Sequence, residues 1–275
     1  MKNSTIAFIG GGNMASSLIG GLIADGCPPG NLWVTDLNQG KLDYLANRFS
    51  INTTPDNNKA VTNADVVVLC VKPQVMHEVI VGITDSIQTR KPLVISVAAG
   101  IREKDLQTWL GGNVAIVRVM PNTPALIQTG ASGLFANTYV SEEQCNLAES
   151  ILRAVGLALW LDDEAMMDIV TALSGSGPAY FFYVMEAMEK AATTLGMEQK
   201  TARLLTLQTA LGAAKMALES AEDIAELRQR VTSPGGTTEQ AINTLQSGGL
   251  ETLFADALTA AANRSKELAK EFGEK

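Results

Sequence analysis

The segment Ser4–Ala15, with the sequence STIAFIGGGNMA, decides the fold. The apolar run Thr5–Ile9 predicts a β-strand, and a helical pattern begins directly after the glycines. Gly10, Gly12 and Ala15 form the pattern G-x-G-x-x-A. In this pattern the first glycine permits a tight turn, and the second lets backbone amides approach a pyrophosphate. The small third residue lets helix and strand pack closely. The pattern alone is weak, and a purely structural glycine-rich turn is the alternative.

Outward from this segment, short apolar runs alternate with helical patterns through residue 163. Nearly continuous apolar strands are typical of a parallel sheet whose two faces are both covered by helices. We therefore expect an α/β domain with a doubly wound, Rossmann-like parallel sheet in residues 1–163. The further predicted strands are NLWVTD (31–36), ADVVVLCV (64–71), PLVISVAA (92–99) and NVAIVRVM (113–120), with GASGLFAN (130–137) and GLALWLD (156–162) as extensions of the sheet.

The sequence pattern changes at Glu164, after an acidic stretch. From there the chain is helical in pattern, as in PAYFFYVMEAMEKAATTLG (178–196) and LETLFADALTAAANRSKELAKEF (250–272). We therefore expect an all-α domain in residues 164–275 that binds substrate and mediates dimerisation. Its alanine-rich helices have more apolar surface than a lone small domain can hide, which predicts an obligate dimer.

The composition limits the classes of protein that fit. A chain of 275 residues with 46% hydrophobic and 18% charged residues is ordinary for a globular protein of one or two domains. Its net charge of −8 disfavours nucleic acid and anionic membranes as partners, and no apolar run is long enough to cross a membrane. The three cysteines and one histidine are scattered, so we expect no metal site and no disulfide framework. With no visible signal peptide, a cytoplasmic location follows by elimination.

The glycine-rich turn and the end of the second strand predict a dinucleotide site. Asp36 follows the turn by about 20 residues, where an acidic residue accepts hydrogen bonds from the adenosine ribose. A solvated loop aspartate or a helix N-cap is the alternative for Asp36. Further ligand contacts are expected at the carboxyl ends of later strands, although Lys72 can equally be a solvated charge and MPNTPA (120–125) a rigid crossover. The expected cofactor-binding residues here are Gly10, Gly12, Asn13, Met14, Ala15, Asp36, Val71, Lys72, Pro73, Ala98, Ala99, Gly100 and Asn122.

A second unusual turn, SPGGTT (233–238), precedes a helical run in the second half. Thr237 and Gln240 fit a capping box, which would make this a plain helix start. That leaves the two glycines and Thr238 without a role. Glycines before a helix expose backbone amides where the helix dipole favours an anion, so a small carboxylate ligand suits this turn.

The turn SGSGPAY (174–180) opens the long helix of the second half. Pro178 suits the first helical position, with Ser176 or Gly177 as the cap. The turn, including Ser174, either lines a substrate cleft or serves only as helix entry.

Together these segments resemble the pyrroline-5-carboxylate reductase family. The resemblance rests on FIGGGNMA, AVTNADVVVLCVKP, VISVAAGI, RVMPNTPA, ALSGSGPAYFF, GAAKM and RVTSPGGTTEQAI, in the family's order over nearly the whole chain. It implies an enzyme of proline biosynthesis that uses NADPH or NADH to reduce the cyclic imine 1-pyrroline-5-carboxylate to L-proline. It also implies homodimers with intertwined α domains, often assembled into decamers.

The resemblance further implies roles for single residues. Thr238 would be the catalytic residue near the imine nitrogen, and Asn57 would lie near the adenosine of the cofactor. No histidine acid is required, because the imine can bind already protonated, and His77 is expected on a helix away from the chemistry. The substrate-binding residues would be Ser174, Ser233, Gly235, Gly236, Thr237 and Thr238.

Two departures from the family pattern affect these expectations. Many relatives carry Ser, Thr, Asn or Arg after the second strand, which suits a 2′-phosphate, whereas Asp36 favours NADH. Lys41, a helical turn further on, could offset part of that charge. Where relatives have EHP, this chain has EDI, so Glu222 is not assigned a substrate contact.

Two other functions remain open at this level. A β-hydroxyacid dehydrogenase would need a lysine base soon after the glycine-rich turn of the α domain, but the first lysine there is Lys190. A non-catalytic NAD-sensing regulator would keep G-x-G-x-x-A and would not need SPGGTT.

Overall fold

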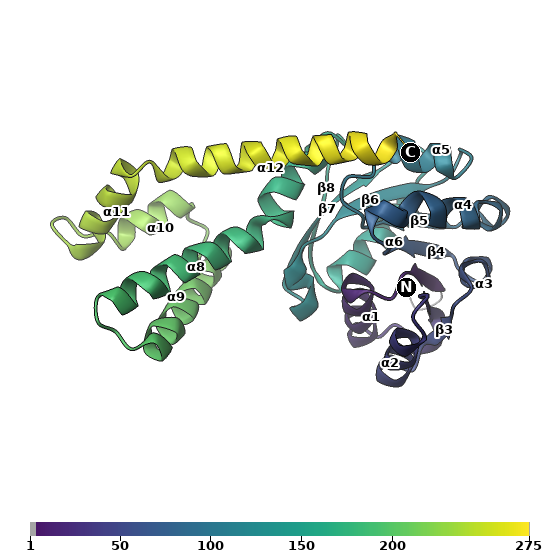
Figure 1. Cartoon of the computed structure of the whole chain (residues 1–275), viewed down its shortest axis with the longest axis horizontal. Coiled ribbons are helices and arrows are strands. Elements are labelled where there is room, and N and C mark those ends of the chain that lie inside the picture. The colour runs from purple at the N-terminus through teal and green to yellow at the C-terminus, as the bar shows by residue number, and fades with distance from the viewer. Residues whose placement is uncertain (1–3, 275) are drawn as a thin grey trace. The chain divides into compact units, whose positions relative to one another are not determined.

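The sheet of the first half has the strand order β3-β2-β1-β4-β5-β6-β7-β8 in this computed structural model, which describes residues 4–274 (Figure 1). All neighbouring strands pair in parallel except β6 and β7, which are antiparallel. The predicted doubly wound sheet is confirmed, with this one antiparallel pair and the short strand β3 as additions. The strands are β1 (Ile6–Ile9), β2 (Leu32–Thr35), β3 (Asn52–Thr54), β4 (Val66–Leu69), β5 (Leu93–Ser96), β6 (Ile116–Met120), β7 (Gly130–Ala136) and β8 (Gly156–Trp160).

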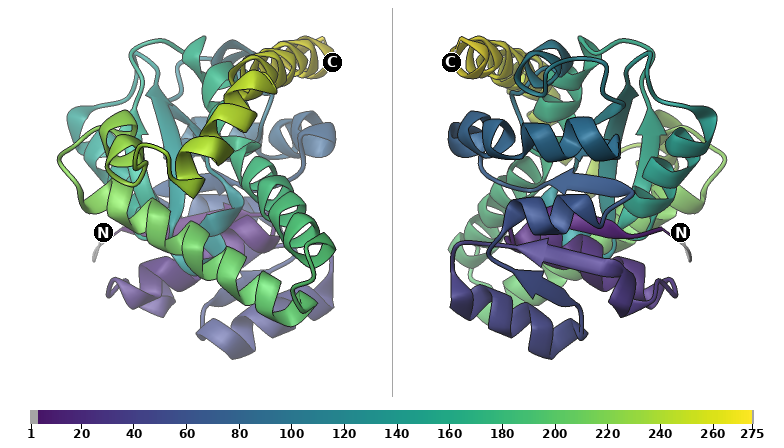
Figure 2. Two further views of the ribbon diagram at one scale, coloured as in Figure 1. Left: turned by 90° about the vertical axis from the view of Figure 1, so that its left-hand side faces the viewer. Right: turned by 90° about the vertical axis from the view of Figure 1, so that its right-hand side faces the viewer.

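Helices cover both faces of this sheet, which explains why its strands are almost wholly apolar (Figure 2). In β1, Phe8 is buried under α1, α2 and α6, while its neighbour Ile9 is buried under α3, α4 and α5. Alternate residues of each central strand therefore belong to separate cores. The helices are α1 (Asn13–Ala24), α2 (Gln39–Phe49), α3 (Asn57–Thr62), α4 (Pro73–Arg90), α5 (Glu103–Trp109) and α6 (Glu142–Arg153), with short 3-10 turns at Pro29–Asn31 and Thr123–Ile127.

The second half is helical, as predicted. It comprises α7 (Met166–Val170), a π-helical turn at Thr171–Gly175, α8 (Gly177–Thr194), α9 (Gln199–Glu219), α10 (Ile224–Arg230), α11 (Thr237–Ser247) and α12 (Leu250–Gly273). None of the helices in residues 4–274 is long and apolar enough to span a membrane.

The chain divides into two compact units at other points than the sequence pattern suggests. The first unit runs to Ser176 and includes the residues from Ala260 onward, and the second is Gly177–Thr259. The expected boundary after residue 163 marks where strands give way to helices. The chain nevertheless stays on the sheet beyond it, since Met167 is buried and Val170 packs against Gly133 of β7.

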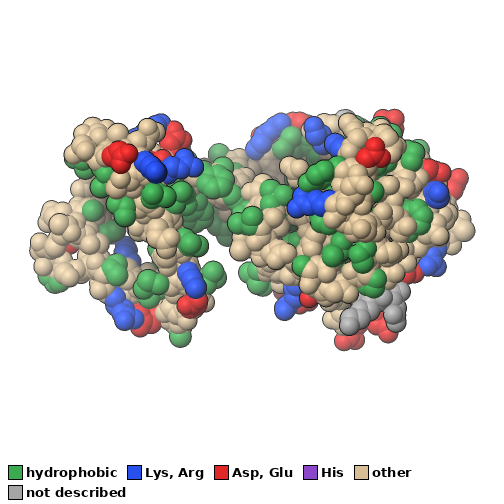
Figure 3. Space-filling model, turned by 90° about the horizontal axis from the view of Figure 1, so that it is seen from below, with side chains coloured by type: hydrophobic (Ala, Val, Ile, Leu, Met, Phe, Trp, Pro, Cys, Tyr) green, Lys and Arg blue, Asp and Glu red, His purple; other side chains and the backbone are tan. Residues whose placement is uncertain are grey.

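The helical unit exposes many large apolar side chains, and Figure 3 shows such side chains in green on the molecular surface. Hydrophobic residues of this size normally lie in a core or an interface. The most exposed include Phe181, Phe182, Tyr183, Leu211, Met216, Leu218 and Leu253.

Candidate functional site

Gly10 makes the turn that ends β1. Its φ is +101°, and a Cβ at this position would lie 3.0 Å from the carbonyl carbon and oxygen of Cys70. The Gly10 amide donates to the carbonyl of Thr35 at 2.9 Å, which ties the turn to the end of β2. A side chain would strain the backbone and push the turn away from β4, so glycine is required here.

The N-terminus of α1 is open to a ligand. Gly12 is its N-cap and supplies no capping side chain, and a Cβ on Gly12 would meet no atom within 4 Å. The first helical hydrogen bond runs from Ser16 to Gly12 at 3.0 Å. The amides of Asn13, Met14 and Ala15 therefore find no acceptor within residues 4–274. Three free donors at the positive end of a helix dipole fit a pyrophosphate group.

Asp36 follows β2 directly and lies beside this helix end. Its Oδ2 accepts from the amide of Gly11 at 3.1 Å and from Lys41 Nζ at 3.2 Å, and its Oδ1 accepts from the amide of Asn38 at 2.9 Å. Burial opposes its ionisation, but the hydrogen bonds from Asn38, Lys41 and Gly11 outweigh burial and lower the pKa of Asp36. Asp36 is not the N-cap of α2, because Asn38 takes that place.

The other predicted cofactor residues lie along the same edge of the sheet. Since β1 to β6 are joined by parallel pairs, the segments that follow them leave from one edge, which is where such sheets bind ligands. Lys72 is the exposed N-cap of α4 and Pro73 its first residue. The predicted residues on this edge, from β3 onward, are Asn57, Val71, Lys72, Pro73, Ala98, Ala99, Gly100 and Asn122.

Gly100 has a left-handed backbone and is covered by the end of α12. Its φ is +73°, and a Cβ there would come within 3.3 Å of the Phe272 ring and 3.4 Å of Leu268. Phe272 also packs against the core beneath α4 and α5. The loop that carries Ala98–Gly100 is thus held from outside by the C-terminal helix, a contact that the sequence pattern does not reveal.

Asn122 and Ser174, predicted for cofactor and substrate respectively, are in direct contact. The Asn122 Nδ2 donates to the carbonyl oxygen and to the Oγ of Ser174, both at 3.2 Å, and its Oδ1 accepts from the amide of Ala131 at 2.9 Å. These bonds occupy the side-chain amide of Asn122. Asn122 thus holds Ser174 in place, and a contact between Asn122 and the coenzyme stays a prediction.

The turn SGSGPAY opens the long helix, as predicted, but α8 begins at Gly177, so Pro178 is its second residue rather than its first. Before this start, α7 (Met166–Val170) is followed by the π-helical turn Thr171–Gly175, with Ser176 as its C-cap. π-Helical turns are uncommon and often lie at functional sites.

The predicted capping box of the SPGGTT turn is also wrong by one residue. Gly236 is the N-cap of α11 and no side chain caps it, while Glu239 reaches back and accepts from the Gly235 amide at 2.8 Å. Both residues of the pair Gly236–Thr237 can begin a helix, and a glutamate in the first turn favours the earlier start.

Because α11 begins one residue earlier than predicted, the Thr237 hydroxyl is not used as a cap. The amide of Gln240 makes the first helical bond, to Gly236 at 3.3 Å. Over the described residues, the hydroxyls of Thr237 and Thr238 have no hydrogen-bond partner. Thr237 is exposed and Thr238 half-buried. Glu222, in contrast, is engaged by Arg230 at 2.7 and 2.8 Å.

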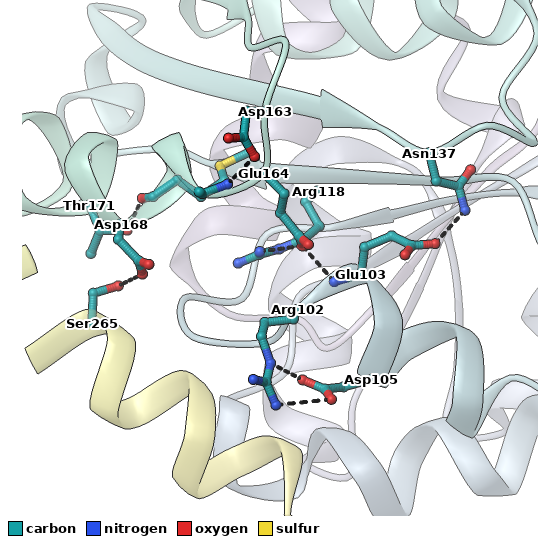
Figure 4. Close-up of polar contacts among 12 residues, drawn as sticks. Arg102, Glu103, Asp105, Arg118, Asn137, Asp163, Glu164, Asp168, Thr171 and Ser265 are labelled. Carbon is teal, nitrogen blue, oxygen red and sulfur yellow. Dashed lines mark hydrogen bonds and ion pairs between the residues drawn. The ribbon is translucent and has the colours of Figure 1, made fainter. Parts of the chain in front are cut away.

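A partly buried ion pair supports the sheet near the π-helical turn (Figure 4). Arg118 of β6 donates to Glu164 at 2.5 Å, and Glu164 also accepts from the amide of Glu103 at 2.6 Å. Asp168 of α7 accepts from the hydroxyl of Ser265 in α12 at 2.6 Å. In the sequence Glu164 marks only the change from strands to helices, and its partner Arg118 is too distant in sequence for a local pattern to show the pair.

The fold and its open glycine turn define a Rossmann-type dinucleotide-binding protein with a helical second unit. Residues 5–100 match the family described as NADP oxidoreductase, coenzyme F420-dependent, and residues 164–268 match the family of pyrroline-5-carboxylate reductase dimerisation domains. The chain is 53% identical over 274 residues to pyrroline-5-carboxylate reductase of Pseudomonas aeruginosa, with 100% of both chains covered.

Solved structures agree with this match. One is a pyrroline-5-carboxylate reductase from Coxiella burnetii, with 53% identity, a TM-score of 0.94, and 97% of this chain and 98% of that chain covered. Another is pyrroline carboxylate reductase of Plasmodium falciparum with NADP bound, with 28% identity, a TM-score of 0.86, and 98% and 99% covered. The chain belongs to the pyrroline-5-carboxylate reductase family.

Proposed function

We propose that this protein reduces 1-pyrroline-5-carboxylate to L-proline with NAD(P)H, as the last step of proline biosynthesis. The observation that carries the proposal is full-length identity of 53% to a reductase of that name. The two uncapped helix starts, at Gly12 and at Gly236, suit the two anionic groups that such an enzyme must hold.

The nucleotide residues of the chain fit the coenzyme. We assign the pyrophosphate to the amides of Asn13, Met14 and Ala15, and the adenosine ribose to Asp36 with Asn57 nearby. The nicotinamide end falls to the segments after β4 and β5. When bound, the coenzyme supplies a hydride from its nicotinamide ring to the carbon of the C=N bond.

The SPGGTT turn is our candidate for holding the substrate carboxylate. The amides of Thr237, Thr238 and Glu239 have no acceptor among the described residues, and they point along the positive end of α11. Ser233, Gly235 and Gly236 complete the turn and leave room for a small ring.

Thr238 is our candidate for the proton side of the reaction. Its hydroxyl makes no hydrogen bond to any residue in the described range 4–274, and it can donate to, or accept from, the imine nitrogen or a water beside it. Because the imine can bind already protonated, a hydroxyl suffices and no histidine acid is needed. His77 is consistent with this, since its ring packs edge-on against Trp109 at 5.1 Å within the nucleotide unit.

The dimerisation domain indicates a homo-oligomer. We propose a dimer as the basic form, with assembly into decamers, because exposed apolar side chains are concentrated on the helical unit. We further propose a cytoplasmic enzyme with no nucleic-acid partner. All three cysteines are unpaired, which suits a reducing compartment, and the net charge is −8.

Following nicotinamide absorbance with the purified protein tests the function. We expect oxidation of NAD(P)H only when 1-pyrroline-5-carboxylate is present, and formation of proline in equal amount. A β-hydroxyacid dehydrogenase would instead reduce NAD(P)⁺ with a hydroxyacid. Tight coenzyme binding without turnover of either substrate would indicate a non-catalytic sensor.

A further inference from the structure

We propose that Lys41 sets the coenzyme choice of this enzyme. Its ammonium group would pair with Asp36 when NADH is bound and turn to the 2′-phosphate when NADPH is bound. This inference rests on the proposed function, because it concerns the adenosine end of the same coenzyme.

The carboxylate of Asp36 is held by partners of two kinds. Gly11 and Asn38 donate through backbone amides at 3.1 and 2.9 Å, and these donors are fixed by the glycine turn and by the entry to α2. Lys41 donates through Nζ at 3.2 Å, at the end of a flexible side chain. The first two bonds hold Asp36 in place, so Lys41 can leave without releasing the carboxylate.

The side chains of Lys41 and Asp36 also differ in their exposure to solvent. The side chain of Lys41 is 52% exposed, whereas that of Asp36 is 15% exposed. A half-exposed lysine can reorient at little cost, whereas a mostly buried carboxylate with two backbone donors cannot. Lys41 is thus the movable partner in the pair.

The position of the Lys41 charge matters because Asp36 and a 2′-phosphate would repel each other. A 2′-phosphate carries a charge of about −1.5 to −2, by analogy with other phosphomonoesters, and would meet the fixed charge of Asp36. Hydrogen bonding keeps Asp36 ionised, so protonation does not remove the conflict. Within residues 4–274, Lys41 is the only side chain in an ion pair with Asp36. The ammonium group of Lys59, in α3, is not in this ion pair; it lies over the ring of Trp33, 6.0 Å from the ring centre.

An exposed leucine beside Asp36 is consistent with placing the adenosine of the coenzyme here. Leu37, directly after Asp36, is 97% exposed. An apolar side chain in that position gives an adenine ring a surface to pack against, next to the carboxylate that would face its ribose.

Binding of coenzyme fragments tests the proposal without relying on turnover. The probes are 2′,5′-ADP, which carries the 2′-phosphate, and 5′-AMP, which lacks it, with NADPH and NADH measured in parallel by fluorescence titration. In Lys41→Met we expect binding of 2′,5′-ADP and NADPH to weaken by roughly tenfold, as for loss of a charged hydrogen bond. Binding of 5′-AMP and NADH should change by less than about twofold, since Asp36 keeps its backbone donors.

Two matched variants sharpen the test. Lys41→Arg keeps the charge and the reach, and should retain most of the 2′,5′-ADP affinity. Lys91→Met removes the same charge at the far end of α4, where the chain turns left-handed, and should leave all four affinities unchanged.

The possible results separate this inference from the proposed function. Equal weakening of 2′,5′-ADP and 5′-AMP in Lys41→Met would show that Lys41 only supports α2, and no change in either would place the 2′-phosphate elsewhere. Either result overturns the inference and leaves the reductase assignment intact. If Lys41→Met weakens binding of 2′,5′-ADP but not of 5′-AMP, while the wild-type protein never reduces the imine, the reductase assignment fails and the role of Lys41 stands. A wild-type protein that binds neither coenzyme would overturn both.

Discussion

The side-chain amide of Asn122 donates to the backbone carbonyl of Ser174 at 3.2 Å, and Pro178, four residues after Ser174, has no N–H to offer that carbonyl. In an α-helix the residue at this spacing would normally donate. Ser174 lies in the π-helical turn Thr171–Gly175, and Asn122, from the loop after β6, gives its carbonyl a donor that Pro178 cannot provide. The same side chain also donates to the hydroxyl of Ser174 at 3.2 Å and so fixes Ser174 in place.

We expect Asn122→Ala to destabilise the protein by about 1–3 kcal/mol, because it leaves the Ser174 carbonyl and the Ala131 amide without partners. Pro178→Ala restores a backbone donor and should recover part of this loss in the double variant. Urea unfolding of the four proteins measures the coupling between the two positions. Strictly additive effects would show that Pro178 and Asn122 do not serve the same carbonyl.

Thr238→Ala should lower kcat by about tenfold to a hundredfold with little change in coenzyme affinity, since one transition-state hydrogen bond is removed. Thr244→Ala is the control, because its hydroxyl is in the same helix, is exposed, and donates to the Gln240 carbonyl at 2.9 Å. Steady-state kinetics with saturating coenzyme distinguish the two. A Thr238→Ala enzyme with the wild-type rate would exclude a catalytic role.

Asp36→Ser should shift the kcat/KM ratio towards NADPH by roughly tenfold, because it removes a negative charge close to the 2′-phosphate. It also frees Lys41 from its ion pair. Initial rates with each coenzyme measure the ratio. An unchanged ratio would mean that Asp36 does not face the ribose.

Phe272→Ala should raise KM for both coenzymes more than it lowers kcat, since the ring covers the Gly100 loop. Phe272→Leu, which refills much of the space, should restore KM. Lys266→Ala, an exposed change in the same helix, serves as control. If the alanine and leucine variants have the same KM, Phe272 does not position this loop.

We expect the buried thiol of Cys70 to lower the free energy of unfolding at alkaline pH. Burial raises the pKa of its thiol from 9.0 to about 12, so the native state holds the proton more tightly than the unfolded chain. This group therefore has no effect on the pH dependence of stability below pH 9, and it lowers stability as the pH rises from 9 towards 12. Unfolding free energies measured across this range should fall less steeply in Cys70→Ala. Parallel curves for both proteins would contradict the prediction.

The nucleotide half could be predicted well because its signals are local. The strand Ile6–Ile9, the turn at Gly10 and the entry to α1 follow from spacing within a few residues. β3 was missed because Asn52–Thr54 is short and polar, so it has no apolar periodicity. The antiparallel direction of β7 depends on how the chain connects β6 to β7, and the residues of β7 alone do not indicate it.

The candidate site was predictable in position but less so in detail. Asp36 was correctly placed after β2, yet its bonds to Gly11 and Lys41 depend on three-dimensional proximity. At SPGGTT two adjacent residues can each start a helix, and Glu239, which accepts from the Gly235 amide, favours the start at Gly236. The contacts Asn122–Ser174 and Gly100–Phe272 join distant segments, which a single sequence cannot pair.

The return of α12 to the sheet unit has a consequence for biosynthesis. Ser265 binds Asp168 and Phe272 covers Gly100, so the unit that begins with β1 is completed only when these late residues have left the ribosome. The intervening helical unit must therefore be made while the first is still unfinished, with its coenzyme loop uncovered. Such long-range closure is slow compared with local helix formation. Emergence of Phe272 from the ribosome, rather than synthesis of the sheet, should then mark the earliest point at which the coenzyme can bind.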